Sequence, residues 1–262
     1  MRRGWAAALS VLWTGTALAQ MPPAPPAPLP VPGAITAMTT QPCQTDRSAT
    51  TDWPNLCRYY TANRSVYRAP PAVMIGDSIT DFWLNLSPAL FAGGVVDRGI
   101  SGQTCAQMAA RFYQDVVRLR PRVVHILCGT NDIAGNQGPV GPDQFANAIL
   151  AMVDMARAND IAVVIGTIPP AGVFNWRGGY RPASEIVSLN AWLRALTQQR
   201  GLILADYYTA LAGPDGAMKP GLSSDGVHPT AAGYAVMEPI TRAALAQAAL
   251  AQADRAPVKL AP

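Results

Sequence analysis

From residue 71 onward, short apolar runs alternate along the chain with longer stretches in which apolar residues recur every three or four positions. The short runs predict buried strands, and the longer stretches predict amphipathic helices. The expected strands span 72–75, 95–98, 123–127, 162–168 and 202–205. Continuously apolar strands separated by helices are typical of parallel sheets. The pattern therefore predicts an α/β fold in which helices cover both faces of a five-stranded parallel sheet.

Four long helices are expected, at 104–120, 142–159, 183–200 and 230–253. The first opens on Thr104 and Gln107, which have the spacing of a capping box, and Pro121 follows its expected end. Gly201 comes directly after the third helix and is a typical stop signal.

The N-terminal 19 residues have the pattern of a secretory signal peptide. Arg2 and Arg3 are followed by an apolar stretch, and Ala17-Leu18-Ala19 predicts cleavage after Ala19. The apolar stretch is shorter than the roughly 20 residues of a membrane-spanning helix. Because no later segment is apolar enough to span, we expect a secreted or periplasmic protein without an integral membrane segment once the signal is removed.

The remaining organisation follows from composition. Residues 20–34 are rich in proline and predict an extended linker. Residues 35–70 are polar and irregular and are expected to form an N-terminal extension that wraps over the main domain at 71–253, with 254–262 as a tail.

Charge and cysteine content narrow the possible partners. The chain has 20 basic and 16 acidic residues, and 18 basic residues remain without the signal's two arginines, so the excess is only +2. This small excess, without a Lys/Arg run, argues against a nucleic-acid partner. Four cysteines fit an oxidising compartment, and their spacing favours a Cys43–Cys57 bridge.

Polar motifs follow the first three expected strands, and one more precedes the last helix. They are Gly76-Asp77-Ser78, Gly99-Ile100-Ser101-Gly102, Gly129-Thr130-Asn131-Asp132 and Asp225-Gly226-Val227-His228. The loops after parallel strands meet at one edge of the sheet, where α/β proteins place their reactive groups. We therefore expect all four motifs to converge.

These residue types suit acyl transfer. Ser78 would be the nucleophile and His228 the base that takes its proton, with Asp225 fixing the tautomer of the imidazole. The backbone N–H groups of Ser78 and Gly102 and the side-chain amide of Asn131 would form the oxyanion hole. Position 80, where a G-x-S-x-G elbow needs glycine, is Thr80, so a conventional α/β-hydrolase is not predicted.

In this order, the four motifs resemble those of the SGNH hydrolases, also called the GDSL esterase/lipase family. The resemblance covers residues 72–245 and gives Ser78, Gly102, Asn131 and His228 the family's four named roles, with Asp225 as the supporting aspartate. It implies a three-layer α/β/α sandwich with flavodoxin-like strand order and hydrolysis of esters or thioesters without a cofactor. The Gly-Asp-Ser-Ile-Thr version resembles the platelet-activating-factor acetylhydrolase-like branch.

Two features of the sequence each allow two interpretations. Cys105 and Cys128 flank the expected oxyanion hole and either form a disulfide that locks its loops or are two independent buried thiols. The aromatic residues of a glycine-rich loop either form a lip over the substrate or cover the sheet edge; they are Phe174, Trp176 and Tyr180.

The sequence thus predicts an exported serine ester hydrolase acting on short-chain acyl esters of a small molecule or a polysaccharide. Carbohydrate O-acetyl esterase, lysophospholipase and thioesterase activities remain open within this class. A non-catalytic carbohydrate-binding module is the alternative from another class. The only other histidine, His125, lies in an apolar strand and is expected in the core, so no metal site is predicted.

Overall fold

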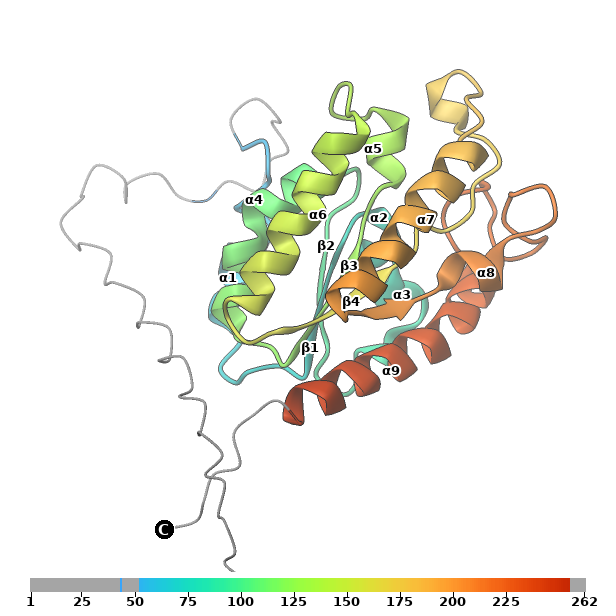
Figure 1. Ribbon diagram of the computed structural model, residues 1–262. Coiled ribbons are helices and arrows are strands. Elements are labelled where there is room, and N and C mark those ends of the chain that lie inside the picture. The colour runs from blue at the N-terminus through green and yellow to red at the C-terminus, as the bar shows by residue number, and fades with distance from the viewer. Residues whose placement is uncertain (1–42, 44–51, 255–262) are drawn as a thin grey trace, which may run out of the picture. The chain divides into compact units, whose positions relative to one another are not determined.

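The computed structural model describes Cys43 and residues 52–254; the expected signal peptide and linker lie outside the described residues. Its centre is a five-stranded, all-parallel sheet with the order β2-β1-β3-β4-β5 (Figure 1). The strands are β1 Ala72–Gly76, β2 Val96–Gly99, β3 Val123–Leu127, β4 Ala162–Gly166 and β5 Ile203–Ala205. The predicted parallel sheet and its flavodoxin-like strand order are therefore confirmed.

The α-helices are α1 Tyr60–Arg64, α2 Ser78–Asp81, α3 Trp83–Leu86, α4 Cys105–Asp115, α5 Thr130–Ala134, α6 Pro142–Arg157, α7 Ala183–Arg200, α8 Tyr207–Leu211 and α9 Ala231–Ala253. Short 3₁₀ turns lie at η2 Pro88–Leu90, η3 Val117–Leu119 and η4 Asn175–Arg177. Among the described helices, none combines the length and apolar character needed to cross a bilayer.

The sheet separates two apolar layers because successive strand residues point to opposite faces. Val73 and Ile75 face the layer formed with α4, α6 and α7, whereas Ala72 and Met74 face the layer formed with α2, α3, α8 and α9. Figure 1 shows α4 and α6 on one side of the sheet and α9 on the other. The expected three-layer architecture is thus present.

Several predicted element ends differ from those in the structure, and two of them have a clear physical reason. The helix expected over 104–120 ends at Asp115, and the 3₁₀ turn η3 follows, which still turns Val117 and Leu119 into the core. The strand expected to reach residue 168 ends at Gly166, because the N–H of Ile168 donates to the Asn190 side chain and no longer to a neighbouring strand.

The described part of the extension, Cys43 and residues 52–70, is more ordered than its polar sequence predicts, because it contains the short helix α1. A disulfide joins Cys43 to Cys57. Beside it, the backbone carbonyls of Trp53 and Pro54 accept hydrogen bonds from Gln107 and Gln103, both at 2.7 Å. These contacts tie the extension to the loop that follows β2.

Candidate active site

The register of the sheet brings three of the four predicted loops together. Gly76, the last residue of β1, is level with Gly99 of β2 and Leu127 of β3. The loops that carry Ser78, Gly102 and Asn131 therefore leave adjacent strands at one edge. Glycine is required at position 76, since a Cβ there would lie 1.9 Å from the Thr80 hydroxyl oxygen.

Ser78 is the first residue of α2. The carboxylate of Asp77 caps this helix by accepting the N–H of Ile79 at 2.9 Å, which fixes the turn between β1 and Ser78. Tyr234 of α9 donates its hydroxyl to the carbonyl of Ile79 at 2.7 Å. The start of α2 is thus fixed by hydrogen bonds from both the preceding turn and α9.

The Ser78 Oγ lies 2.8 Å from His228 Nε2, although the two residues are 150 positions apart. On the other side of the imidazole, His228 Nδ1 lies 2.6 Å from Asp225 Oδ2. The structure therefore aligns a hydroxyl, an imidazole and a carboxylate in one hydrogen-bonded series. This is the arrangement in which an imidazole can withdraw a proton from a serine.

The loop that carries Asp225 fixes the orientation of this carboxylate. Its Oδ1 accepts the backbone N–H groups of Val227 and His228 at 2.9 and 2.8 Å and the hydroxyl of Ser223 at 3.1 Å. Burial opposes ionisation of Asp225, but the hydrogen bonds from His228 and Val227 outweigh it and lower its pKa to about 2. Asp225 is therefore a carboxylate throughout the neutral range.

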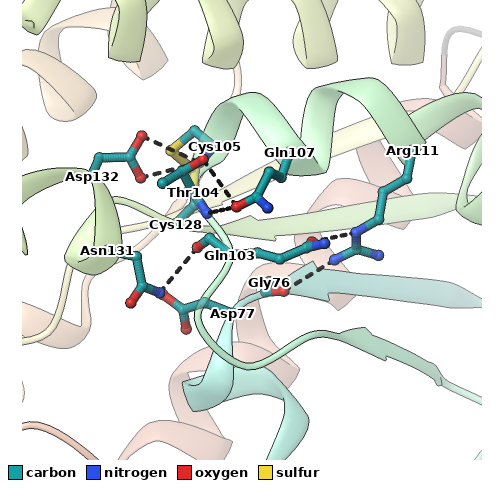
Figure 2. Close-up of a disulfide and its surroundings, with 10 residues drawn as sticks. All are labelled: Gly76, Asp77, Gln103, Thr104, Cys105, Gln107, Arg111, Cys128, Asn131 and Asp132. Atoms are coloured by element: carbon teal, nitrogen blue, oxygen red, sulfur yellow. Dashed lines mark hydrogen bonds between the residues drawn. A yellow bond between two sulfur atoms is a disulfide. The ribbon is translucent and has the colours of Figure 1, made fainter. Parts of the chain in front are cut away.

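Asn131, in the first turn of α5, is buried beside the loop after β2. Figure 2 shows its amide directed at the carbonyl of Gln103, to which Nδ2 donates at 3.0 Å. The same Nδ2 lies 3.3 Å from Asp77 Oδ2. Gly102, the residue before Gln103, has a φ of +82°, a left-handed conformation that glycine adopts without strain.

A fully buried arginine on α4 contacts both the end of β1 and the loop after β2. Arg111 donates to the Gln103 side chain at 2.6 Å and to the carbonyl of Gly76 at 3.1 Å (Figure 2). Burial lowers the pKa of Arg111, and the ion pair with Asp115 at 3.0 Å acts in the opposite direction. One guanidinium thus connects the end of β1 with the loop after β2.

Cys105 and Cys128 form a disulfide, as one of the two interpretations predicted. It joins the start of α4, three residues after Gly102, to the end of β3, three residues before Asn131. Asp132 adds to this link by accepting the N–H of Cys105 with both carboxylate oxygens (Figure 2). The two loops are therefore connected covalently and by hydrogen bonds.

The three aromatic residues of the glycine-rich loop do not share one role. Phe174 is fully buried in the core, which favours for this residue the interpretation in which the aromatic rings cover the sheet. Tyr180 hydrogen-bonds to Glu185 of α7. Trp176 is half exposed and stacks on Phe174, with ring centroids 4.7 Å apart.

Sequence reasoning missed Phe82, an exposed residue beside the imidazole. Its ring centroid lies 5.2 Å from that of His228. Phe82 comes four positions after Ser78, one helical turn on, so helical spacing from the serine was the signal that would have indicated it. Close to Phe82, the Asp81 carboxylate accepts the hydroxyl of Ser101 at 2.6 Å, which links α2 to the loop after β2.

His125 is buried in β3 as expected, and its Nε2 lies 2.7 Å from the Tyr207 hydroxyl. Burial lowers the pKa of His125 to about 3, so it is neutral at pH 7. Within Cys43 and residues 52–254, no group of three or more His, Cys, Asp or Glu side chains is arranged to hold a metal ion.

The chain is similar to one family model and to three solved structures. The model of the GDSL-like lipase/acylhydrolase family matches residues 74–236. A candidate acylhydrolase of Bacteroides fragilis is 39% identical, with a TM-score of 0.73 over 75% of this chain and 98% of that one. The chain belongs to the GDSL-like lipase/acylhydrolase family.

Two further structures share the fold. A GDSL-like lipase of Bacteroides thetaiotaomicron is 35% identical, with a TM-score of 0.72 over 75% of this chain and 99% of that one. An acetylxylan esterase variant of Geobacillus stearothermophilus, 20% identical, shares the fold with a TM-score of 0.55 over 68% of this chain and 95% of that one. No curated protein sequence matches the chain. Family membership makes this GDSL-like protein an ester hydrolase in general terms.

Three largely buried carboxyl groups of this hydrolase have raised pKa values. Burial raises the pKa of Asp77 to about 7 and that of Asp132 to about 6. It also raises the pKa of Asp97 in β2 to about 7, against the hydrogen bond from the N–H of Gly99 at 2.6 Å. Asp97 is the one of these three that lies outside the Ser78 and Asn131 loops, so a substitution there changes neither of those loops.

We expect Asp97→Asn to stabilise the protein more at pH 8 than at pH 4.5. Since the pKa of Asp97 is raised from 3.8 to about 7 on folding, its stabilising contribution is full below 3.8 and is lost as the pH rises through 7. Asparagine keeps an oxygen for Gly99 and does not titrate. Urea unfolding of both proteins across this range measures the difference, and a pH-independent difference would contradict the prediction.

Proposed function

We propose that this chain hydrolyses short-chain acyl esters through an acyl-enzyme on Ser78, with His228 as general base and Asp225 as the carboxylate that orients it. The observation that carries the proposal is the series from Ser78 Oγ through His228 to Asp225, at 2.8 and 2.6 Å. A serine that only capped a helix would not need an imidazole and a carboxylate aligned behind it.

In the acylation step, Ser78 Oγ attacks the ester carbonyl carbon while its proton passes to His228 Nε2. The tetrahedral intermediate then collapses, the bond to the alcohol oxygen breaks, and the imidazolium returns the proton to the departing alcohol. Asp225 stays ionised because its pKa is about 2, and its charge stabilises the imidazolium in this step.

Deacylation repeats these steps with water. His228 removes a proton from a water molecule, the resulting hydroxide attacks the acyl carbon, and the proton then passes to Ser78 Oγ as the acid is released. The reaction needs no cofactor.

The proposed oxyanion hole consists of the N–H groups of Ser78 and Gly102 and the Asn131 amide. Such donors stabilise the negative charge that develops on the carbonyl oxygen, and each is worth about 3 kcal/mol. Two observations support it: Asn131 donates to the carbonyl of Gln103, the residue after Gly102, and the N–H of Gly102 makes no hydrogen bond within the described part of the chain.

The position of Phe82 favours a substrate with a short acyl or alcohol group. Its exposed ring lies beside the imidazole, where such a group would pack. We propose that the enzyme acts outside the cytoplasm. The predicted signal segment and the two disulfides, Cys43–Cys57 and Cys105–Cys128, support export.

A fluorophosphonate probe tests the proposal on the intact protein. We expect one label per chain, located at Ser78 by peptide mass mapping, together with hydrolysis of p-nitrophenyl esters that declines as the acyl chain lengthens. Acetylated xylan and a lysophospholipid in the same assay distinguish a carbohydrate O-acetyl esterase from a lysophospholipase. No label at Ser78 and no ester hydrolysis would instead favour a non-catalytic carbohydrate-binding module.

A further inference from the structure

Three side chains from two separate loops form a hydrogen-bonded series that ends at the proposed oxyanion hole. The indole Nε1–H of Trp176 donates to Asn136 Oδ1 at 3.0 Å. Asn136 Nδ2 donates to Asn131 Oδ1 at 2.5 Å, and Asn131 Nδ2 donates to the Gln103 carbonyl at 3.0 Å. The half-exposed Trp176 is therefore two hydrogen bonds away from the amide of Asn131.

The chemistry of the two ends fixes the direction of every bond in the series. An indole nitrogen can only donate, and a backbone carbonyl can only accept. Asn136 must therefore turn its oxygen to Trp176 and its amino group to Asn131. Asn131 must in turn direct its own amino group toward Gln103, the side on which Gly102 lies. The series thus fixes the amide orientation in which the donor Nδ2 faces the loop that carries Gly102.

Asn131 needs such support because its amino group has a competing acceptor. Asp77 Oδ2 lies 3.3 Å from Nδ2 and, when ionised, attracts the same hydrogens that an oxyanion would use. A bond to Asn131 Oδ1 holds the amide from its far end. It also strengthens the N–H groups as donors, because hydrogen bonds in series polarise one another.

The outer end of the series is itself anchored. The Trp176 ring stacks on the buried Phe174, and Arg177 donates to the carbonyl of Ile133 in α5 at 2.5 Å. The backbone N–H of Asn136 donates to the carbonyl of Asn131 at 3.1 Å. The glycine-rich loop is therefore attached to the same helix that carries Asn131.

We propose that Asn136 and Trp176 are positioning residues that hold Asn131 in its oxyanion-binding orientation; this inference rests on the proposed function. Neither residue contacts the reacting atoms in this role. Both act on the transition state, where the oxyanion exists, and not on binding of the ester, so their removal lowers kcat and leaves KM nearly unchanged.

Two conservative substitutions isolate the bonds in question. Asn136→Asp keeps the size of the side chain and the acceptor for Trp176 but replaces the donor to Asn131 by a carboxylate oxygen that repels Asn131 Oδ1. Trp176→Phe keeps the stacking ring but loses the indole N–H. Both positions are exposed, so we expect both variants to fold. Asn159→Asp is the matched control, because this exposed asparagine at the end of α6 donates to the carbonyl of Met155.

In steady-state hydrolysis of p-nitrophenyl acetate, we expect Asn136→Asp to lower kcat by about tenfold or more, since small displacements of catalytic groups have large effects. Trp176→Phe should lower kcat by about fivefold, the equivalent of one neutral hydrogen bond. Asn159→Asp should match the wild type.

A double-mutant cycle with Asn131→Ala decides the question. Asn131→Ala alone should lower kcat by about 10²-fold to 10³-fold, and adding Asn136→Asp should then cause no further loss, because the side chain that it positions is gone. If the two losses multiply, or if Asn136→Asp alone leaves kcat unchanged, the positioning role is overturned while the oxyanion hole stands. If Asn131→Ala has full activity, both are overturned.

Discussion

Replacing Ser78 by alanine should lower kcat for p-nitrophenyl acetate by about 10⁴-fold or more. The change removes the oxygen that would form the acyl-enzyme, and the imidazole 2.8 Å away has no other group to activate at that position. The Ser78 side chain contributes little to the fold, since within the described residues its hydroxyl hydrogen-bonds to His228 alone. Steady-state kinetics, with thermal unfolding followed by circular dichroism, measures both effects.

Ser188→Ala provides the matched control for this substitution. Ser188 is an exposed serine on α7 whose hydroxyl donates to the carbonyl of Ser184 at 2.9 Å, so the same atom is removed far from the imidazole. It should retain wild-type kinetics. Activity in Ser78→Ala equal to that of Ser188→Ala would eliminate the acyl-enzyme on Ser78.

The parts of the site that were predictable are those encoded within one loop or by the end of a strand. Asp225 and His228 are three positions apart, so a single turn is enough to bring carboxylate and imidazole together. Ser78 and Asn131 each follow an apolar run, and parallel strands that are level at their carboxyl ends necessarily bring such residues to the same edge.

The supporting contacts were not predictable, because they join segments that are distant in the sequence. Arg111 lies 35 positions from Gly76, and Trp176 lies 40 positions from Asn136. In sequence, Arg111 is one polar residue on an amphipathic helix, and only the packed structure places its guanidinium under two loops. No local pattern distinguishes it from a solvent-exposed arginine.

Phe174 and Trp176 illustrate the limit of reading a loop from its composition. Both are aromatic and lie two positions apart, which left a substrate lip and a cover for the sheet edge equally plausible. A short 3₁₀ turn over Asn175–Arg177 buries the first ring and leaves the second half exposed. Such a turn depends on contacts with α5 and the core, and these are absent from the local sequence.

Asp225→Asn should lower kcat by about 10⁴-fold while leaving the fold intact. Oδ1 accepts three hydrogen bonds, from Ser223, Val227 and His228, so an asparagine would keep its carbonyl oxygen there and turn its amino group toward His228 Nδ1. An amino group donates, so Nδ1 must become the acceptor and the ring proton moves to Nε2. A protonated Nε2 cannot take the proton of Ser78, and kinetics at pH 7 to 8 measures the loss.

Asp154→Asn is the matched control, because it makes the same chemical change at an exposed carboxylate. Asp154 lies on α6 and pairs with Arg200 of α7 at 3.1 Å. It should leave kcat unchanged. If Asp225→Asn also retained wild-type kcat, the imidazole would be oriented by other groups, and the carboxylate would serve only to close its own loop. A loss confined to KM would likewise contradict the tautomer argument, since the tautomer of His228 affects proton transfer in the transition state and not the binding of the ester.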